Sequence, residues 1–161
     1  IVSRLLEFSR DTDTLALFDL NDVLETVVSL NSKFFQHERI DISTNFQSLP
    51  KVFGSKDQLE QVLMNIVLNA QAAMPSGGAL TIQTYTEGNF VVAEIRDTGI
   101  GIAPEAMNKI FDPFFSTKPT GTGLGLFVSH GIIEAHNGTI DVKSALDQGT
   151  TFTIKLPYQT K

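Results

Sequence analysis

Two glycine-rich turns lie close together in the middle of the chain, and any fold must accommodate both. The first reads DTGIG at residues 97–101, and the second reads GTGLGL at residues 121–126. Glycine permits close approach of another molecule to the backbone, and a glycine turn that leads into a helix offers free N–H groups to an anion. Either turn alone is more simply explained as an ordinary loop. Together, with the acid at Asp97, they predict a binding site built from two turns.

Composition bounds the size of the domain and the classes of partner. The chain has 161 residues, 42% of them apolar, which suffices for one domain with a full core but not for two of ordinary size. A net charge of −6 argues against the basic surface that nucleic acid requires, so we expect small-molecule or protein partners. The chain has no cysteine, no signal-like leader and no apolar run of the roughly 20 residues that span a bilayer. We therefore expect a cytoplasmic domain without membrane contact.

The first long helix is predicted over residues 18–38, where apolar residues recur at steps of three and four. Asn21 or Asp22 is expected as its N-cap. Its expected buried residues are Val23, Val27, Leu30 and Phe34.

Two further long helices and one short helix follow. The second begins at Ser55 or Asp57 as N-cap. The third covers residues 124–136 and stops at residues 137–138, and a short helix begins at Pro104. The expected buried stripe of the second helix is Leu59, Val62, Leu63, Ile66, Val67, Ala70 and Ala73.

Alternation of apolar and polar residues predicts the strands. They cover residues 40–46, 79–86, 89–97, 139–144 and 150–157. The short connection at Glu87 and Gly88 indicates a hairpin. Helices and antiparallel strand pairs in this order predict an α+β fold, a two-layer sandwich whose one mixed, mostly antiparallel sheet is covered on one face by three helices.

Asn65 and Asn69 stand four residues apart on the second helix, so they share a face about 6 Å apart at Cβ. Asparagine is a poor residue for a helix interior. The pair could simply bond to neighbouring backbone. Alternatively the two amide oxygens could bind Mg²⁺, which usually takes one or two protein oxygens beside water and phosphate.

Asp97 ends a predicted strand and begins the first glycine turn. Its carboxylate can accept a hydrogen bond from the exocyclic amine of adenine, whereas guanine presents a carbonyl oxygen there. Two acceptors facing each other, the carboxylate and the guanine carbonyl, would weaken binding by on the order of 1–3 kcal/mol. Asp97 would then select adenine; otherwise it is a common strand-end turn residue.

The second glycine turn fits neither a P-loop nor a Rossmann fingerprint. Its glycines nevertheless lie at a helix start, where free N–H groups and the helix dipole favour phosphate oxygens. Lys118 could reach the terminal phosphates as a point charge, or could be an ordinary surface lysine.

Five motifs occur in the order of a known family. Asn65-x-x-x-Asn69-Ala70, DTGIG, FDPFF at residues 111–115, GTGLGL and the terminal Gly149-Thr150 resemble the N, G1, F and G2 boxes and the final Gly-Thr of sensor histidine kinases. The resemblance covers residues 18–157 and extends to the catalytic, ATP-binding domain of the GHKL superfamily, nearest to nitrogen-regulation-type kinases. It implies the Bergerat fold.

The resemblance also implies roles for individual residues. Asn69 would hold Mg²⁺ with help from Asn65, and these two with Lys118 would be the catalytic residues. Asp97 would bind the adenine amine. The implied ATP site comprises Asn65, Asn69, Asp97, Gly99, Gly101, Phe114, Lys118, Gly121, Thr122, Gly123, Leu124, Gly125, Leu126 and Thr150.

By the same resemblance, the chain divides into two parts. Residues 1–14 would be the end of a helical dimerisation and phosphoacceptor hairpin with its linker, and residues 15–161 the ATP-binding catalytic domain. The protein-histidine kinase activity would transfer the ATP γ-phosphate to a histidine on that hairpin, which we expect outside this chain. A response regulator would be the indirect partner, and the parent, expected to be a homodimer, could be membrane-anchored.

Two departures from the family pattern bear on this interpretation. Residues 71–73 lack the basic residue that many members carry after the Asn-Ala pair. His37-Glu38 imitates the phosphoacceptor dipeptide but is expected to lie on the surface, while His130 and His136 are expected to be structural. Two alternatives stay open: a nucleotide-gated ATPase clamp, whose relatives place glutamate where this chain has Asn65, and a serine kinase that binds a sigma factor.

Overall fold

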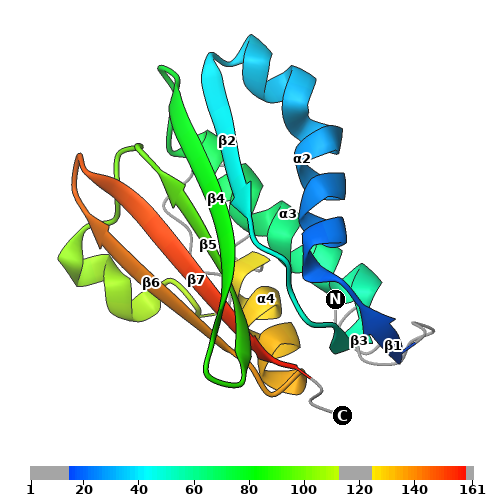
Figure 1. The fold of residues 1–161 in the computed structure, drawn as a ribbon. Coiled ribbons are helices and arrows are strands. Elements are labelled where there is room, and N and C mark those ends of the chain that lie inside the picture. The colour runs from blue at the N-terminus through cyan, green and yellow to red at the C-terminus, as the bar shows by residue number, and fades with distance from the viewer. Residues whose placement is uncertain (1–14, 113–124, 159–161) are drawn as a thin grey trace, which may run out of the picture.

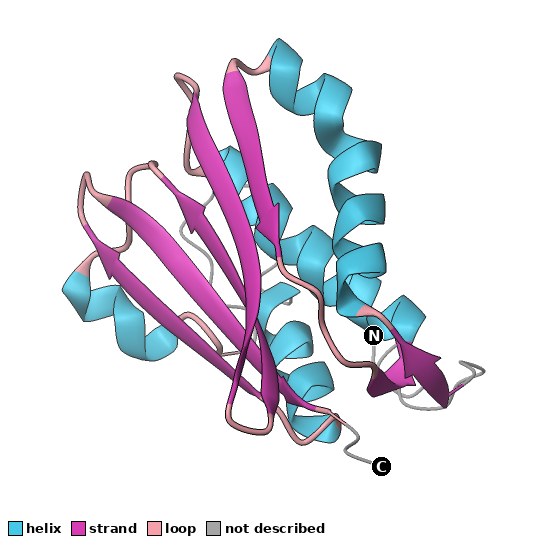
Figure 2. Cartoon of the chain, viewed as in Figure 1, coloured by secondary structure: helices cyan, strands magenta, loops and turns pink. Residues whose placement is uncertain are grey.

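A computed structural model describes residues 15–112 and 125–158. One layer is a five-stranded sheet, and three long helices form a second layer on one of its faces (Figures 1 and 2). In sheet order, the strands are β2 (Ile40–Phe46), β4 (Gly78–Glu87), β5 (Phe90–Asp97), β7 (Gly149–Pro157) and β6 (Thr139–Ala145). The β2–β4 pair is parallel and the other three pairs are antiparallel. The predicted α+β sandwich is confirmed.

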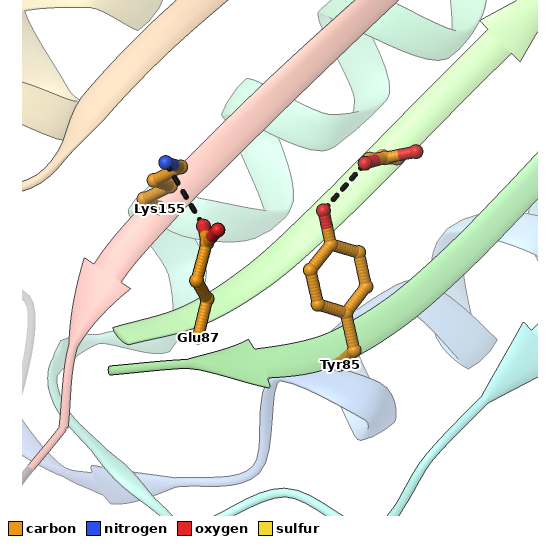
Figure 3. A network of polar contacts seen from close by, with 4 residues as sticks. Tyr85, Glu87 and Lys155 are labelled. Atoms are coloured by element: carbon orange, nitrogen blue, oxygen red, sulfur yellow. Dashed lines mark hydrogen bonds and ion pairs between the residues drawn. The ribbon is translucent and has the colours of Figure 1, made fainter. Parts of the chain in front are cut away.

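The central strands alternate between a buried and a polar face. Leu80 and Ile82 of β4 and Ile95 of β5 point into the core beneath the helices. On the open face, Tyr85 of β4 hydrogen-bonds to Glu94 of β5, as Figure 3 shows. Because side chains alternate along a strand, this one pattern places the core on a single side of the sheet.

Helix α2 (Leu20–His37) has a different N-cap and buries a different face than predicted. Asp19, and not Asn21 or Asp22, is the N-cap, with its side chain accepting from the Asn21 N–H at 2.9 Å. Leu30 and Phe34 are 62% and 43% exposed, so their predicted burial is wrong. The residues that the helix does bury are Leu20, Val23, Leu24, Val27, Asn31 and Phe35.

Helices α3 (Lys56–Ala72) and α4 (Gly125–Ala135) agree with the predicted elements. Ser55 is the N-cap of α3 and accepts from the Gln58 N–H at 3.2 Å. The predicted buried stripe is observed except for Ala73, which is half-buried just past the helix end. After α4, Asn137 adopts a positive φ of 62°, and the Gly138 N–H returns to the Ile133 carbonyl at 2.9 Å, which ends the helix.

Several local features differ from the predictions. Strands β1 (Leu15–Phe18) and β3 (Val52–Ser55) form a separate two-stranded antiparallel sheet that was not predicted, because four-residue strands give too short a pattern. The β4–β5 hairpin turns at residues 88–89, since Glu87 pairs with Phe90. The short helix η1 (Pro104–Lys109) is a 3₁₀ helix. Among the described helices, none combines the length and apolarity needed to cross a membrane.

Candidate functional site

Asp97, at the end of β5, is a buried carboxylate that backbone N–H groups hold in place. It is 5% exposed, and its Oδ1 accepts from the Gly99 N–H at 2.8 Å and the Thr150 N–H at 3.2 Å. Burial raises the pKa of this carboxyl group, and the two backbone hydrogen bonds oppose the rise. Its Oδ2 has no hydrogen-bond partner among the described residues. Within the described part of the chain, Oδ2 is therefore a buried acceptor that can take a hydrogen bond from a ligand.

The DTGIG loop packs so tightly that two of its residues must be glycine. A Cβ at Gly99 would lie 2.4 Å from the Ala73 carbonyl oxygen, and one at Gly101, whose φ is +76°, would lie 2.0 Å from the Ala145 carbonyl oxygen. The Ile100 N–H also donates to the Ala73 oxygen at 2.9 Å. The loop thus packs between the end of α3 and the β6–β7 turn. These contacts fix the position of Asp97.

Residues on β6 and β7 complete this part of the site. Thr150 is buried, and its Oγ1 lies 2.8 Å from the Oγ of Ser144. Ser144 Oγ accepts from the Ile102 N–H at 2.8 Å and contacts the Gly149 oxygen at 3.0 Å. Ser144 was not predicted as a site residue, because no local pattern distinguishes it from other strand serines. Its side chain connects the segment after the DTGIG turn to the start of β7.

Asn65, near the middle of α3, faces the start of α4. Its Nδ2 donates to the Gly125 oxygen at 3.4 Å and to the Ser129 Oγ at 3.3 Å. Ser129 is completely buried and was not predicted as a site residue. With Nδ2 directed to α4, Oδ1 has no partner among the described residues. Asn69, also half-buried, lies one turn further along α3.

The chemistry of these donors bears on a metal. Within residues 15–112 and 125–158, no group of three or more His, Cys, Asp or Glu side chains is placed to hold a metal ion. The asparagine amides are neutral oxygen donors, and such donors suit Mg²⁺ when phosphate oxygens supply the negative charge. The residues present therefore fit a metal that arrives with a phosphorylated ligand.

Helix α3 forms the wall that joins the two parts of the site. Its end at Ala73 touches the DTGIG loop, and Asn65 touches the start of α4, about 12 Å away along the helix axis. An extended ligand could contact Asp97 with one end and the start of α4 with the other. The predicted site residues outside the described part of the chain are Phe114, Lys118, Gly121, Thr122, Gly123 and Leu124.

Comparisons with known proteins agree with this arrangement. Residues 54–160 match the family model described as histidine kinase-, DNA gyrase B-, and HSP90-like ATPase. Over 159 residues the chain is 39% identical to the sensor histidine kinase ZraS of Escherichia coli (strain K12), and the match covers 98% of this chain and 34% of ZraS. The chain thus spans about a third of the length of this curated relative.

Solved histidine kinase structures have the same fold. The catalytic domain of ThkA is similar with a TM-score of 0.81 and 31% identity, over 89% of this chain and 95% of that chain. Full-length ShkA in complex with AMPPNP is similar with a TM-score of 0.83 and 30% identity, over 94% and 32% of the two chains. ThkA in complex with the response regulator protein TrrA gives a TM-score of 0.80 and 27% identity, over 98% and 46%.

Proposed function

Because the chain belongs to the family of histidine kinase-, DNA gyrase B- and HSP90-like ATPases, we propose that it is the ATP-binding catalytic domain of a sensor histidine kinase in two-component signal transduction. In this role it presents the γ-phosphate of ATP to a histidine on a helical hairpin. The observation that carries the proposal is the buried carboxylate of Asp97, held at Oδ1 by two backbone N–H groups and open at Oδ2 within the described structure.

Asp97 selects the base in this proposal. The exocyclic amine of adenine donates to Oδ2, while guanine would place a carbonyl oxygen against the carboxylate at a cost on the order of 1–3 kcal/mol. Gly99, Gly101 and Thr150 surround the base. Gly99 and Gly101 lie in the loop that follows Asp97, and Thr150, near the start of β7, donates its N–H to Asp97. These positions support the assignment.

Asn69 and Asn65 hold Mg²⁺ in this proposal, with Asn65 contributing its Oδ1. When bound, the metal neutralises charge on the phosphates. The support is the neutral amide donor set and the contact between Asn65 and the start of α4.

The second glycine turn covers the phosphates in this proposal. Gly125 and Leu126 begin α4, an 11-residue helix whose first N–H groups and dipole favour an anion. Lys118 is assigned to the terminal phosphate and Phe114 to the ATP site, on the sequence resemblance alone. The residues assigned to the phosphates are Gly121, Thr122, Gly123, Leu124, Gly125 and Leu126.

The acceptor histidine comes from another part of the protein. Phosphoryl transfer requires chiefly positioning and charge neutralisation, and the described histidines are poorly suited to accept. His136 uses both ring nitrogens in hydrogen bonds, and His130 lies against Phe111 with Nδ1 3.7 Å from Glu134. His37 is exposed at the end of α2, on a different element from Asp97 and Asn65.

We assign residues 15–161 to the catalytic domain and residues 1–14 to the end of the hairpin and its linker. The parent acts as a cytoplasmic homodimer, with or without a membrane anchor, and passes its phosphate to a response regulator. The complex of the similar kinase ThkA with the response regulator protein TrrA supports this partner class.

A transfer experiment tests the function. The chain is mixed with labelled ATP, Mg²⁺ and a separately prepared histidine-bearing hairpin, with His37→Gln as a matched control. We expect acid-labile phosphate on the hairpin for both versions of the chain, none on the chain by itself, and none after chelation of Mg²⁺.

Other outcomes contradict the proposal. Steady release of inorganic phosphate without transfer would identify a nucleotide-gated clamp. Acid-stable phosphate on a partner serine would identify a serine kinase, and label on His37 would show that the chain contains its own acceptor.

A further inference from the structure

His136 directly follows α4, and both of its ring nitrogens form hydrogen bonds. Nδ1 lies 2.8 Å from the Ile132 carbonyl oxygen, and Nε2 lies 3.0 Å from the Ser55 backbone nitrogen. A carbonyl oxygen can only accept and a backbone N–H can only donate. The proton is therefore on Nδ1, and Nε2 is the unprotonated acceptor.

The ring contacts the chain at the point where α3 begins. A Cβ at residue 54 would lie 2.2 Å from the His136 Cδ2, so Gly54 makes room for the imidazole. Ser55, the next residue, is the N-cap of α3. His136 thus joins the end of α4 to the N-cap of α3, across 81 positions of sequence.

A second connection joins the same two helices at the opposite end of α4. Asn65 Nδ2 contacts the Gly125 oxygen and the buried Ser129 Oγ. The helices are antiparallel, since Ser55 meets the end of α4 while Asn65 meets its start. The two connections lie about 16 Å apart along α4.

We propose that His136 is a positioning residue that sets the lengthwise position of α4 on α3. Two fixed points prevent α4 from sliding or tilting, so the bond at His136 keeps Gly125 against Asn65 at the other end. Ile132 and Ile133 pack in the core between these points, but apolar contacts lack the directionality of a hydrogen bond. The effect on nucleotide binding rests on the proposed function; the position of the helix does not.

The first test reads the geometry without nucleotide. Long-range ¹⁵N–¹H spectra of the wild-type chain should show His136 protonated on Nδ1. The side-chain amide signal of Asn65 should shift in His136→Leu, which fills the space but offers no acceptor. It should keep its wild-type position in His136→Gln, whose Oε1 can accept from the Ser55 N–H, and in the exposed control His37→Gln.

A merely local role would leave the Asn65 amide unchanged in His136→Leu, and that result would overturn the proposal. A proton on Nε2 in the wild-type chain would also overturn it, without requiring any variant to fold.

The second test measures Mg-ATP affinity by calorimetry. We expect about tenfold weaker binding in His136→Leu, as for the loss of one well-placed hydrogen bond, and a change of less than about threefold in His136→Gln. Equal losses in both variants would contradict a role for the acceptor. If the wild-type chain binds no ATP, the proposed function fails, while the spectra still decide the role of His136.

Discussion

At the scale of single residues, the buried carboxylate of Asp97 lowers the stability of the folded state. We propose that its burial serves ligand binding. Burial raises its pKa above the ordinary value of 3.8, against the lowering effect of the Gly99 and Thr150 hydrogen bonds. Because the pKa of Asp97 is higher in the folded state than in the unfolded state, its protonated form stabilises the fold. This contribution is fully present below pH 3.8 and is lost as pH rises through the folded-state pKa. Near neutral pH the charged carboxylate therefore opposes folding.

Asp97→Asn should separate these two effects. Its Oδ1 can still accept from both backbone N–H groups, so we expect a higher free energy of unfolding than in the wild type near neutral pH, and convergence below pH 3.8. ATP affinity should fall by about 10- to 100-fold, because Nδ2 and the adenine amine are both donors. Urea unfolding and calorimetry measure the two quantities.

The exposed Asp141 on β6 provides a matched control. Asp141→Asn should change neither quantity appreciably. Unchanged ATP affinity in Asp97→Asn would remove Asp97 from the base site.

On the open face of the sheet, Tyr85 and Glu94 titrate as partners (Figure 3). The Tyr85 hydroxyl donates to Glu94 Oε2 at 2.5 Å, and this bond is the main cause that raises the pKa of Tyr85 to about 12. The bonds from Tyr85 and Gln83 lower the pKa of Glu94 below its ordinary 4.5. Glu94 therefore contributes stability above pH 4.5 that is lost as pH falls through its folded-state pKa.

Glu94→Gln should move the pKa of Tyr85 from about 12 towards its ordinary 10.0, because the charged acceptor is gone. The chain has two tyrosines, so the absorbance titration is done in a Tyr158→Phe background. Glu87 pairs with Lys155 at 3.0 Å and is only the weakest cause of the Tyr85 shift, so Glu87→Gln should change the titration much less. A titration unmoved by Glu94→Gln would show that the bond is not the cause.

At the scale of elements, α2 carries two overlapping apolar stripes. The stripe through Leu30 and Phe34 suits a helix by spacing alone, but the helix packs with Leu24 and Phe35 inward. Which stripe is buried depends on what the neighbouring helix and sheet present, and that information lies outside the helix.

The pair Leu24 and Leu30 tests this orientation. Leu24→Ala should cost about 2–5 kcal/mol of unfolding free energy, because it leaves a cavity in the core. Leu30→Ala removes an exposed side chain and should change stability by less than about 0.5 kcal/mol. Urea unfolding measures both losses. A larger loss in Leu30→Ala than in Leu24→Ala would mean that α2 faces the core as the sequence spacing suggested.

At the scale of the whole molecule, the sheet order decides which loops meet. Strands β5 and β7 are neighbours although residues 98–148 separate them. Their adjacency brings the Thr150 N–H to Asp97. Helix α3 then connects this corner to the start of α4, so the site is a product of the complete two-layer packing.

The sequence predicted the elements of the sheet and the helices because periodic patterns are local. It also indicated Asp97, Gly99 and Gly101, because a carboxylate in a dense glycine turn is an unusual local feature. The sequence did not predict the short β1–β3 sheet, the role of Ser144 or the orientation of α2, because each depends on contacts between distant segments.

By itself, then, the sequence determined the order of the long helices and of the five strands of the main sheet, the two glycine turns and the family. Only the tertiary structure decided that Thr150 supports Asp97 from 53 positions away, that Asn65 faces Gly125, and that His136 meets Ser55. The physical reason is range: helix and strand patterns are set by neighbours within a few residues, whereas a backbone N–H finds a distant acceptor only when the whole core is packed.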